Sequence, residues 1–265
     1  MLLFRASLRR IPGSHAFRCG ALGAEVGCPA VACIVVSGAS GEFGPTLVKF
    51  LIRRGDKVAA LGSPRSAERL RGLQVELGTN SLAIPMDATS LAEWKSALER
   101  VEQVLAPPSG AALLAGGWEG GHPFHESDDA IWQRMLTVNL ETARRSLQAL
   151  LPAMIRRGAG SIVVMGSQVV ERPWKGAGAA AYTAAKSAVV ALARAVAAEV
   201  ASKGIRVNAV MPSVIDTAAN RAAMPKADPK RWVSGESLAE TIGFLLSDAA
   251  KDISGAALAV YGQSG

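Results

Sequence analysis

The stretch Ser37-Gly-Ala-Ser-Gly-Glu-Phe-Gly44 lies between a short apolar run at residues 32–36 and a helical pattern that begins at Pro45. A short, continuously apolar run is typical of a strand that is buried on both faces. Proline suits the first position of a helix. Glycines between a strand and a helix let the backbone approach a phosphate, and the free N–H groups of the helix favour its charge. The stretch therefore predicts a strand, a phosphate-binding turn and a helix, although a GxxGxxG pattern alone is a weak indicator.

Strand-like and helix-like segments alternate along the rest of the chain. Further strands are expected at residues 57–61, 81–84, 110–114, 161–165, 206–210 and 256–260. Helices are expected at residues 45–54, after the capping box Ser90-x-x-Glu93, and at residues 130–157 and 181–203. Such alternation indicates a parallel sheet with helices on both faces. We expect residues 30–265 to form one α/β domain, a Rossmann-type doubly wound sheet of seven strands.

Residues 1–29 differ from the rest of the chain and are expected to lie outside this domain. Four arginines precede the first acidic residue, Glu25. An acid-poor segment that contains arginines is typical of a mitochondrial presequence, but also of a disordered extension without a targeting role. We favour the extension and a cytoplasmic protein, with a mitochondrial location as the alternative.

Composition argues against several classes of protein. The net charge is +7, but basic and acidic residues are mixed after residue 29, without interleaved aromatics, so we expect no nucleic-acid partner. No apolar run reaches the roughly 18 residues that a membrane span needs. Three cysteines near the N-terminus, without a histidine cluster at zinc-ligand spacing, predict neither a disulfide framework nor a metal site. The expected partner is a small-molecule substrate.

Tyr182 and Lys186 are candidates for proton chemistry. Residues four apart on a helix share one face. An ammonium beside a phenol favours the phenolate and lowers the tyrosine pKa from about 10. A phenol tuned in this way exchanges a proton near neutral pH, as reduction of a carbonyl requires. The pair alone is weak, because Tyr-x-x-x-Lys arises by chance in many helices.

In their order and spacing, the motifs of residues 30–265 resemble those of the short-chain dehydrogenase/reductases. Four further matches carry this resemblance: Leu114-Ala-Gly-Gly-Trp118, Thr137-Val-Asn-Leu140, Ser167, and Val210-Met-Pro-Ser-Val-Ile-Asp-Thr217. The resemblance implies an NAD(P)-dependent enzyme that transfers a hydride between a nicotinamide cofactor and a carbonyl or alcohol group.

Residue roles follow from the resemblance. Tyr182 is the implied general acid/base, and Ser167 holds the substrate oxygen. Lys186 contacts the nicotinamide ribose, and Asn139 helps to hold a water that returns the proton. The implied cofactor-binding residues are Gly38, Ser40, Gly41, Phe43, Gly44, Arg65, Asp87, Ala115, Gly116, Lys186, Pro212, Val214 and Thr217. The expected substrate contacts are Trp118, Ser167 and Tyr182.

Two positions bear on how the cofactor is bound. Glu42 replaces the middle glycine of the common family turn and would repel a pyrophosphate, so we expect its carboxylate to point into solvent. Arg65 follows the second strand, where no acid stands to bind a free ribose hydroxyl. NADP is therefore favoured, with NAD as the alternative.

Two alternatives to a carbonyl reductase remain. Residues 115–121 and 216–225 resemble stretches of quinonoid dihydropteridine reductase, which also uses GxxGxxG. That relative lacks the serine after the fifth strand, so Ser167 favours ordinary carbonyl chemistry. A dinucleotide-binding protein without turnover is the other alternative, since a fold does not establish a function.

The helix at residues 181–203 also bears on assembly. Its alanines recur near helical spacing, and small side chains let helices approach closely. In the resembling family this helix lies at a two-fold interface, and two different two-fold interfaces give a tetramer. We expect a homodimer or, in preference, a homotetramer. Residues 213–232 are expected to form a lid over the substrate.

Overall fold

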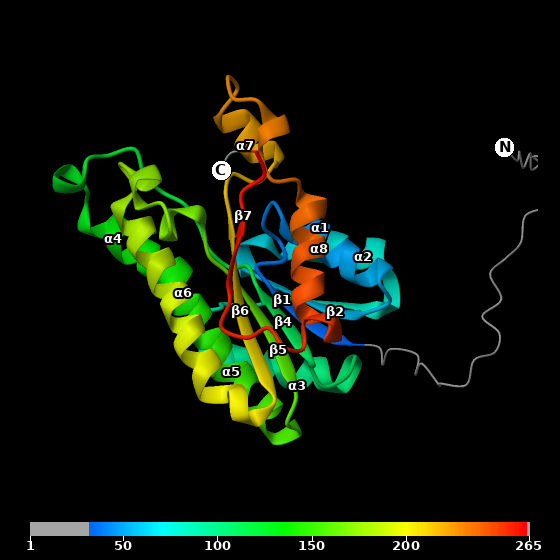
Figure 1. The fold of residues 1–265 in the computed structure, drawn as a ribbon. Coiled ribbons are helices and arrows are strands. Elements are labelled where there is room, and N and C mark those ends of the chain that lie inside the picture. The colour runs from blue at the N-terminus through cyan, green and yellow to red at the C-terminus, as the bar shows by residue number, and fades with distance from the viewer. Residues whose placement is uncertain (1–31, 264–265) are drawn as a thin grey trace, which may run out of the picture. The chain divides into compact units, whose positions relative to one another are not determined.

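A seven-stranded parallel sheet forms the centre of the protein in the computed structural model, which describes residues 32–263 (Figure 1). Its strand order is β3-β2-β1-β4-β5-β6-β7. The strands are β1 (Cys33–Ser37), β2 (Lys57–Gly62), β3 (Ser81–Pro85), β4 (Gly110–Leu113), β5 (Gly160–Met165), β6 (Ile205–Pro212) and β7 (Ala257–Val260). The predicted fold class is confirmed, and each strand lies close to its expected range. The proposed extension, residues 1–29, lies outside the described residues.

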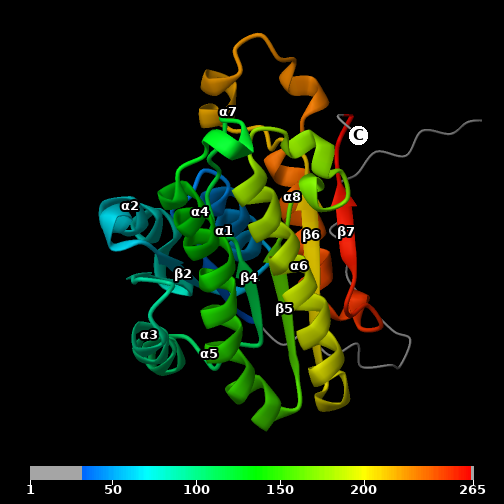
Figure 2. The same ribbon diagram turned by 90° about the vertical axis from the view of Figure 1, so that its left-hand side faces the viewer.

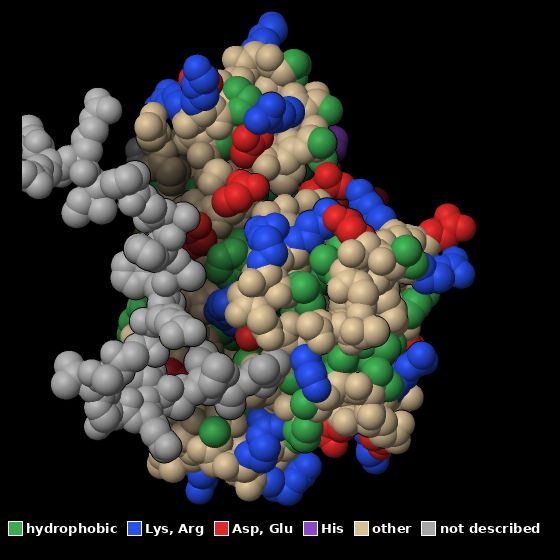
Figure 3. All heavy atoms as spheres, turned by 90° about the vertical axis from the view of Figure 1, so that its right-hand side faces the viewer, with side chains coloured by type: hydrophobic (Ala, Val, Ile, Leu, Met, Phe, Trp, Pro, Cys, Tyr) green, Lys and Arg blue, Asp and Glu red, His purple; other side chains and the backbone are tan. Residues whose placement is uncertain are grey.

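Helices cover both faces of the sheet. One face carries α1 (Gly44–Arg53), α2 (Ala67–Leu77) and α8 (Gly235–Leu246), and the other carries α3 (Leu91–Val104), α5 (Thr142–Arg157) and α6 (Ala180–Val200) (Figures 1 and 2). The short helices α4 (Asp129–Met135) and α7 (Ala218–Ala223) follow β4 and β6. On the face with α1, α2 and α8, the described acidic and basic side chains are interspersed (Figure 3).

The alternation of side chains along β1 shows why its sequence is continuously apolar. Cys33 and Val35 pack into the core beneath α3, α5 and α6, whereas Ile34 and Val36 pack into the core beneath α1, α2 and α8. All four are at most 2% exposed. Because both faces of a parallel sheet are covered, every position of such a strand is selected for apolar character.

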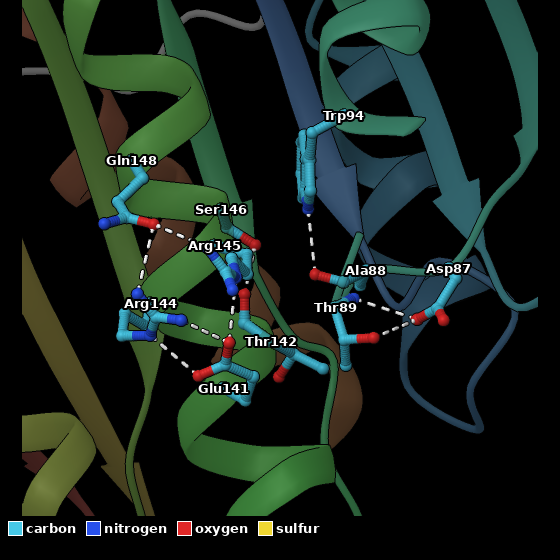
Figure 4. Close-up of polar contacts among 10 residues, drawn as sticks. All are labelled: Asp87, Ala88, Thr89, Trp94, Glu141, Thr142, Arg144, Arg145, Ser146 and Gln148. Atoms are coloured by element: carbon cyan, nitrogen blue, oxygen red, sulfur yellow. Dashed lines mark hydrogen bonds and ion pairs between the residues drawn. The ribbon is translucent and has the colours of Figure 1, made fainter. Parts of the chain in front are cut away.

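A π-helical segment interrupts the helix that was expected over residues 130–157. It spans Leu136–Glu141 between α4 and α5 and contains Asn139. Just after it, Thr142 donates to the Val138 carbonyl. Ser146 donates to the Thr142 carbonyl, and Glu141, the last residue of the segment, accepts from Arg144 and Arg145 (Figure 4). The hydrogen bond from Arg144 lowers the pKa of Glu141. Such segments often occur at functional sites.

Gly44 and Gly72 form a matched pair that tests the packing of the glycine-rich turn. A Cβ at Gly44 would lie 2.3 Å from the Ala39 carbonyl oxygen, whereas a Cβ at Gly72, in α2, meets nothing within 4 Å. We expect Gly44→Ala to lower the free energy of unfolding by about 3 kcal/mol, because α1 must move away from the turn. Gly72→Ala should raise it by about 0.5–1 kcal/mol, because a helical glycine is replaced. Urea unfolding measures both, and equal effects would contradict the close contact.

Candidate active site

A cleft of about 560 Å³ opens at the carboxyl ends of β1 to β4. The strand order reverses between β1 and β4, and crevices at such switch points are the usual ligand sites of open α/β sheets. The cleft is lined by part of the predicted cofactor set: Gly38, Ser40, Gly41, Arg65, Asp87, Ala115 and Gly116. These residues come from four different connections, and the fold brings them together at one edge of the sheet.

Within the turn, the glycines serve different purposes. Gly38 has φ +79°, and a Cβ there would lie 2.6 Å from the Ala115 nitrogen. It therefore allows the turn after β1 to pass close to the turn after β4. Phe43 and Gly44 are buried on the core side of the turn, and their side-chain positions do not line the cleft.

Glu42 is exposed, as expected, but it does not simply point into solvent. Arg69, on α2, donates to its carboxylate at 3.0 Å and to the Ser40 carbonyl at 2.9 Å. The guanidinium therefore offsets the negative charge on the turn and ties the turn to α2. The sequence analysis missed Arg69 because nothing local marks it; its role depends on how α2 packs beside the turn.

Asp87 lies in the cleft at the end of β3, in a turn with its own hydrogen bonds. Its carboxylate accepts from both the backbone N–H and the hydroxyl of Thr89, and the Trp94 indole donates to the Ala88 carbonyl (Figure 4). Only half of the expected capping box forms: Ser90 accepts from the Glu93 N–H, but the Glu93 carboxylate accepts from the Asp87 N–H instead. The cap of α3 thereby holds the Asp87 turn.

Lys186 is buried behind Gly116, a residue of the cleft wall. Its ammonium donates to the Met165 carbonyl at 2.9 Å and lies 6.0 Å from the Tyr182 ring centroid. A Cβ at Gly116 would lie 3.3 Å from the lysine Nζ. Burial lowers the pKa of Lys186 from 10.5 to about 8. The lysine lies on the same helix as Tyr182, and its ammonium lies against the wall of the cleft.

The expected lowering of the Tyr182 pKa by Lys186 is wrong for this structure. Burial raises the pKa of Tyr182, and a hydrogen bond with the Ser167 side chain partly offsets the rise. The ammonium instead points at the Met165 carbonyl. Tyr182 is therefore a protonated phenol at neutral pH, which is the form that donates a proton.

Asn139 is buried at 1% exposure and is held by the turn after β4. Its amide nitrogen donates to the Gly117 carbonyl at 3.0 Å and to Met135, and its oxygen accepts from the Gly117 N–H at 3.2 Å. The π-helical segment therefore turns Asn139 toward the end of β4, close to Gly116 in the cleft wall.

Comparison with known proteins identifies the family. The model of the family described as short chain dehydrogenase matches residues 32–228. The chain belongs to the short-chain dehydrogenase family. It is therefore a member of an oxidoreductase family, as the motifs predicted.

Three similar members of the family illustrate the range. The chain is 32% identical to 2-(S)-hydroxypropyl-CoM dehydrogenase 3 of Xanthobacter autotrophicus, covering 86% of this chain and 94% of that one. It is also 32% identical to the inactive 2-(S)-hydroxypropyl-CoM dehydrogenase 2 of the same organism, covering 82% and 98%. The structure of a 3-ketoacyl-(acyl-carrier-protein) reductase from Brucella melitensis, complexed with NADH, is 25% identical, with a TM-score of 0.79 and coverage of 88% and 98%.

In this short-chain dehydrogenase, two connections flank the Tyr182 helix. The one after β4 carries Trp118, which is 67% exposed, and the one after β5 carries Trp174, which is 69% exposed. The N–H of Gly121 donates to the Gly178 carbonyl at 2.8 Å and joins the two connections. Neither tryptophan packs into the core, so Trp118 stays a candidate substrate contact.

The remaining predicted cofactor residues lie at the end of β6 and beyond it. Pro212 is buried, whereas Val214 and Thr217 are half-buried, and Thr217 caps α7 by accepting from the Asn220 N–H. None of the three lines the cleft. The expected lid contains α7, and its two ends are joined where the Val233 N–H donates to the Val214 carbonyl at 2.9 Å. Its mobility stays a prediction.

Among residues 32–263, no cluster of three or more His, Cys, Asp or Glu side chains is arranged to hold a metal ion. None of the described helices is long and apolar enough to cross a membrane. Cys33 is a buried free thiol whose pKa burial raises to about 11, so it is a poor nucleophile.

Proposed function

We propose that this short-chain dehydrogenase transfers a hydride between NADP and a carbonyl or alcohol substrate, with Tyr182 as the general acid/base. The observation that carries the proposal is the position of Gly116. It lines the cleft, and a Cβ there would lie 2.6 Å from Asn139 Oδ1 and 3.3 Å from Lys186 Nζ. The cleft proposed for the dinucleotide therefore adjoins the candidate catalytic cluster.

The residues of the cleft fit a nicotinamide dinucleotide. The close approach of Gly38 to Ala115 leaves backbone rather than side chains at the turn, as binding of a pyrophosphate requires. At the adenosine end, Arg65 offers a guanidinium that binds anions, and Asp87 offers a carboxylate that accepts hydrogen bonds. When bound, the nicotinamide supplies or accepts the hydride.

The protein's own groups would then handle the proton and the substrate oxygen. Tyr182, protonated at neutral pH, would donate its hydroxyl proton to the substrate oxygen as negative charge develops there. Ser167, which lies beside Tyr182, would donate to the same oxygen and fix its position. Lys186, held by the Met165 carbonyl, would keep a positive charge beside the tyrosine that loses its proton.

The inactive relative from Xanthobacter autotrophicus makes a binding protein without turnover the second candidate. Dihydropteridine reductase-like pterin reduction is a third. Fluorescence titration with NADH and NADPH, followed by turnover assays on ketones, aldehydes, alcohols and a quinonoid dihydropterin, distinguishes the three. Binding without turnover on any substrate would favour the second candidate, and turnover of the pterin alone would favour the third.

Arg65 and Arg69 should affect the two cofactors differently. Arg65 lies in the cleft at the adenosine end, so Arg65→Ala should weaken NADPH by about 1.5–3 kcal/mol and NADH much less, because only NADPH has a 2′-phosphate. Arg69→Ala should weaken both cofactors alike, because it exposes the pyrophosphate they share to the uncompensated charge of Glu42. Titration of both variants measures this. The exposed Arg71 of α2 gives a matched control, Arg71→Ala, and equal losses from Arg65→Ala would contradict its 2′-phosphate role.

Assembly through α6 is a further part of the proposal. Ala185 packs inward at 0% exposure, but Ala191, Ala195 and Ala198 face outward. A stripe of small outward residues suits close contact with a second copy, so we expect a homodimer or homotetramer. Light scattering at micromolar concentration measures the mass, and a monomer mass near the chain's 27.4 kDa would reject the interface.

A further inference from the structure

Tyr261 follows β7 and reaches across to the connection between β5 and α6. Its hydroxyl donates to Glu171 Oε2 at 2.6 Å, and the Arg172 guanidinium lies 4.8 Å above its ring centroid. Burial, together with the hydrogen bond to Glu171, raises the pKa of Tyr261 to about 12. The hydroxyl therefore stays a donor throughout the neutral range. In Figure 2 the end of β7 lies beside this connection.

The same short segment, Tyr261–Gln263, is also tied to both ends of the lid. The Ser213 hydroxyl donates to the Tyr261 carbonyl at 2.8 Å, at the start of the lid. The Gln263 N–H donates to the Arg231 carbonyl at 3.0 Å, near its end. Gly262 has φ +59°, and a Cβ there would lie 2.9 Å from the Trp232 carbonyl oxygen. We name residues 261–263 the C-terminal strap.

Glu171 is close in the chain to the candidate catalytic serine. Ser167 begins the short 3-10 turn Gln168–Val170 by accepting from the Val169 N–H, and Glu171 ends the turn. The hydrogen bond from Tyr261 to Glu171 therefore restrains the far end of the turn that begins at Ser167, the residue proposed to hold the substrate oxygen. No backbone hydrogen bond joins the glycine-rich turn to the strap, and residues 261–263 do not line the cleft, so the cleft should not depend on the strap.

We propose that Tyr261 is a positioning residue: through Glu171 and Arg172 it fixes the β5–α6 connection, and with it Ser167, relative to the lid. The catalytic consequence rests on the function proposed above. A loosened connection would let Ser167 sample orientations that do not meet the substrate oxygen. Turnover should fall, while binding of the dinucleotide should not.

Hydrogen exchange measured by mass spectrometry tests the restraint without using activity. Tyr261→Phe keeps the ring over Arg172 but removes the donor, and Glu171→Ala removes the acceptor. Each should raise exchange of residues 168–176 about fivefold, the worth of one partly exposed hydrogen bond, and leave residues 38–44 unchanged. Glu171→Gln keeps an acceptor oxygen and should restore most of the protection. Glu102→Ala, on the exposed surface of α3, is the matched control.

Kinetics on a substrate found in the panel tests the consequence. Tyr261→Phe should lower kcat about fivefold with an unchanged dissociation constant for the dinucleotide, and the double variant with Glu171→Ala should be no worse than either single one. Unchanged exchange at residues 168–176, additive losses, or equal losses in kcat and cofactor binding would each overturn the proposal. A wild-type protein inactive on every substrate would instead reject the proposed function, and the exchange data would still decide the restraint.

Discussion

Tyr182→Phe should reduce turnover by about 10²-fold or more while both dinucleotides still bind. The ring fills the same half-buried position, so only the hydroxyl is lost. In the proposed mechanism that hydroxyl is the proton donor, and Ser167 lies beside it, so one substrate oxygen would meet both groups. Steady-state rates, together with fluorescence titration of NADPH, measure the two halves of this expectation.

The chain's other tyrosine gives the comparison. Tyr261→Phe also removes one hydroxyl, but it should cost only about fivefold, since that hydroxyl donates a hydrogen bond to Glu171 and transfers no proton to substrate. The two variants should therefore differ by at least about tenfold in kcat. Similar rates for both would remove Tyr182 from the role of general acid/base, whatever the cofactor affinities.

Features that depend on neighbouring residues in the chain were predictable from the sequence. The continuous apolar run of β1 follows from burial on both faces, and the glycine-rich turn follows from the helix that it precedes. Parallel strands then place the turns after β1 to β4 at one edge, so Gly38, Arg65, Asp87 and Gly116 were expected to meet and do line one cleft. The spacing of Tyr182 and Lys186 likewise places both on α6.

Features that depend on packing between distant segments were not predictable. Arg69 meets Glu42 only because α2 packs beside the turn, and Tyr261 meets Glu171 across 90 positions of sequence. No local pattern marks the π-helical segment that presents Asn139. The direction of the Tyr182 pKa was missed for the same reason: helical spacing does not reveal that Lys186 points at the Met165 carbonyl or how far both groups are buried.

Lys186→Met should lower turnover by about 10²-fold and yet stabilise the protein at pH 7. Burial lowers the pKa of Lys186 from 10.5 to about 8. Below pH 8 the charged lysine therefore lowers the free energy of unfolding by about 3 kcal/mol. Removing the ammonium also leaves the Met165 carbonyl without this donor, which costs about 1–2 kcal/mol. The net gain at pH 7 should therefore be about 1–2 kcal/mol.

The sign of that gain should change with pH. Between pH 8 and 10.5 the unfolded chain holds a proton that the folded lysine has lost, so wild-type stability rises with pH relative to the variant. Near pH 10.5 the charge penalty is gone and only the lost hydrogen bond remains, so wild type should become the more stable protein. Urea unfolding at pH 7 and pH 10 measures the difference, with Lys203→Met, an exposed lysine just beyond α6, as the control. A variant that is less stable than wild type at pH 7 would show that the buried ammonium does not destabilise the folded state.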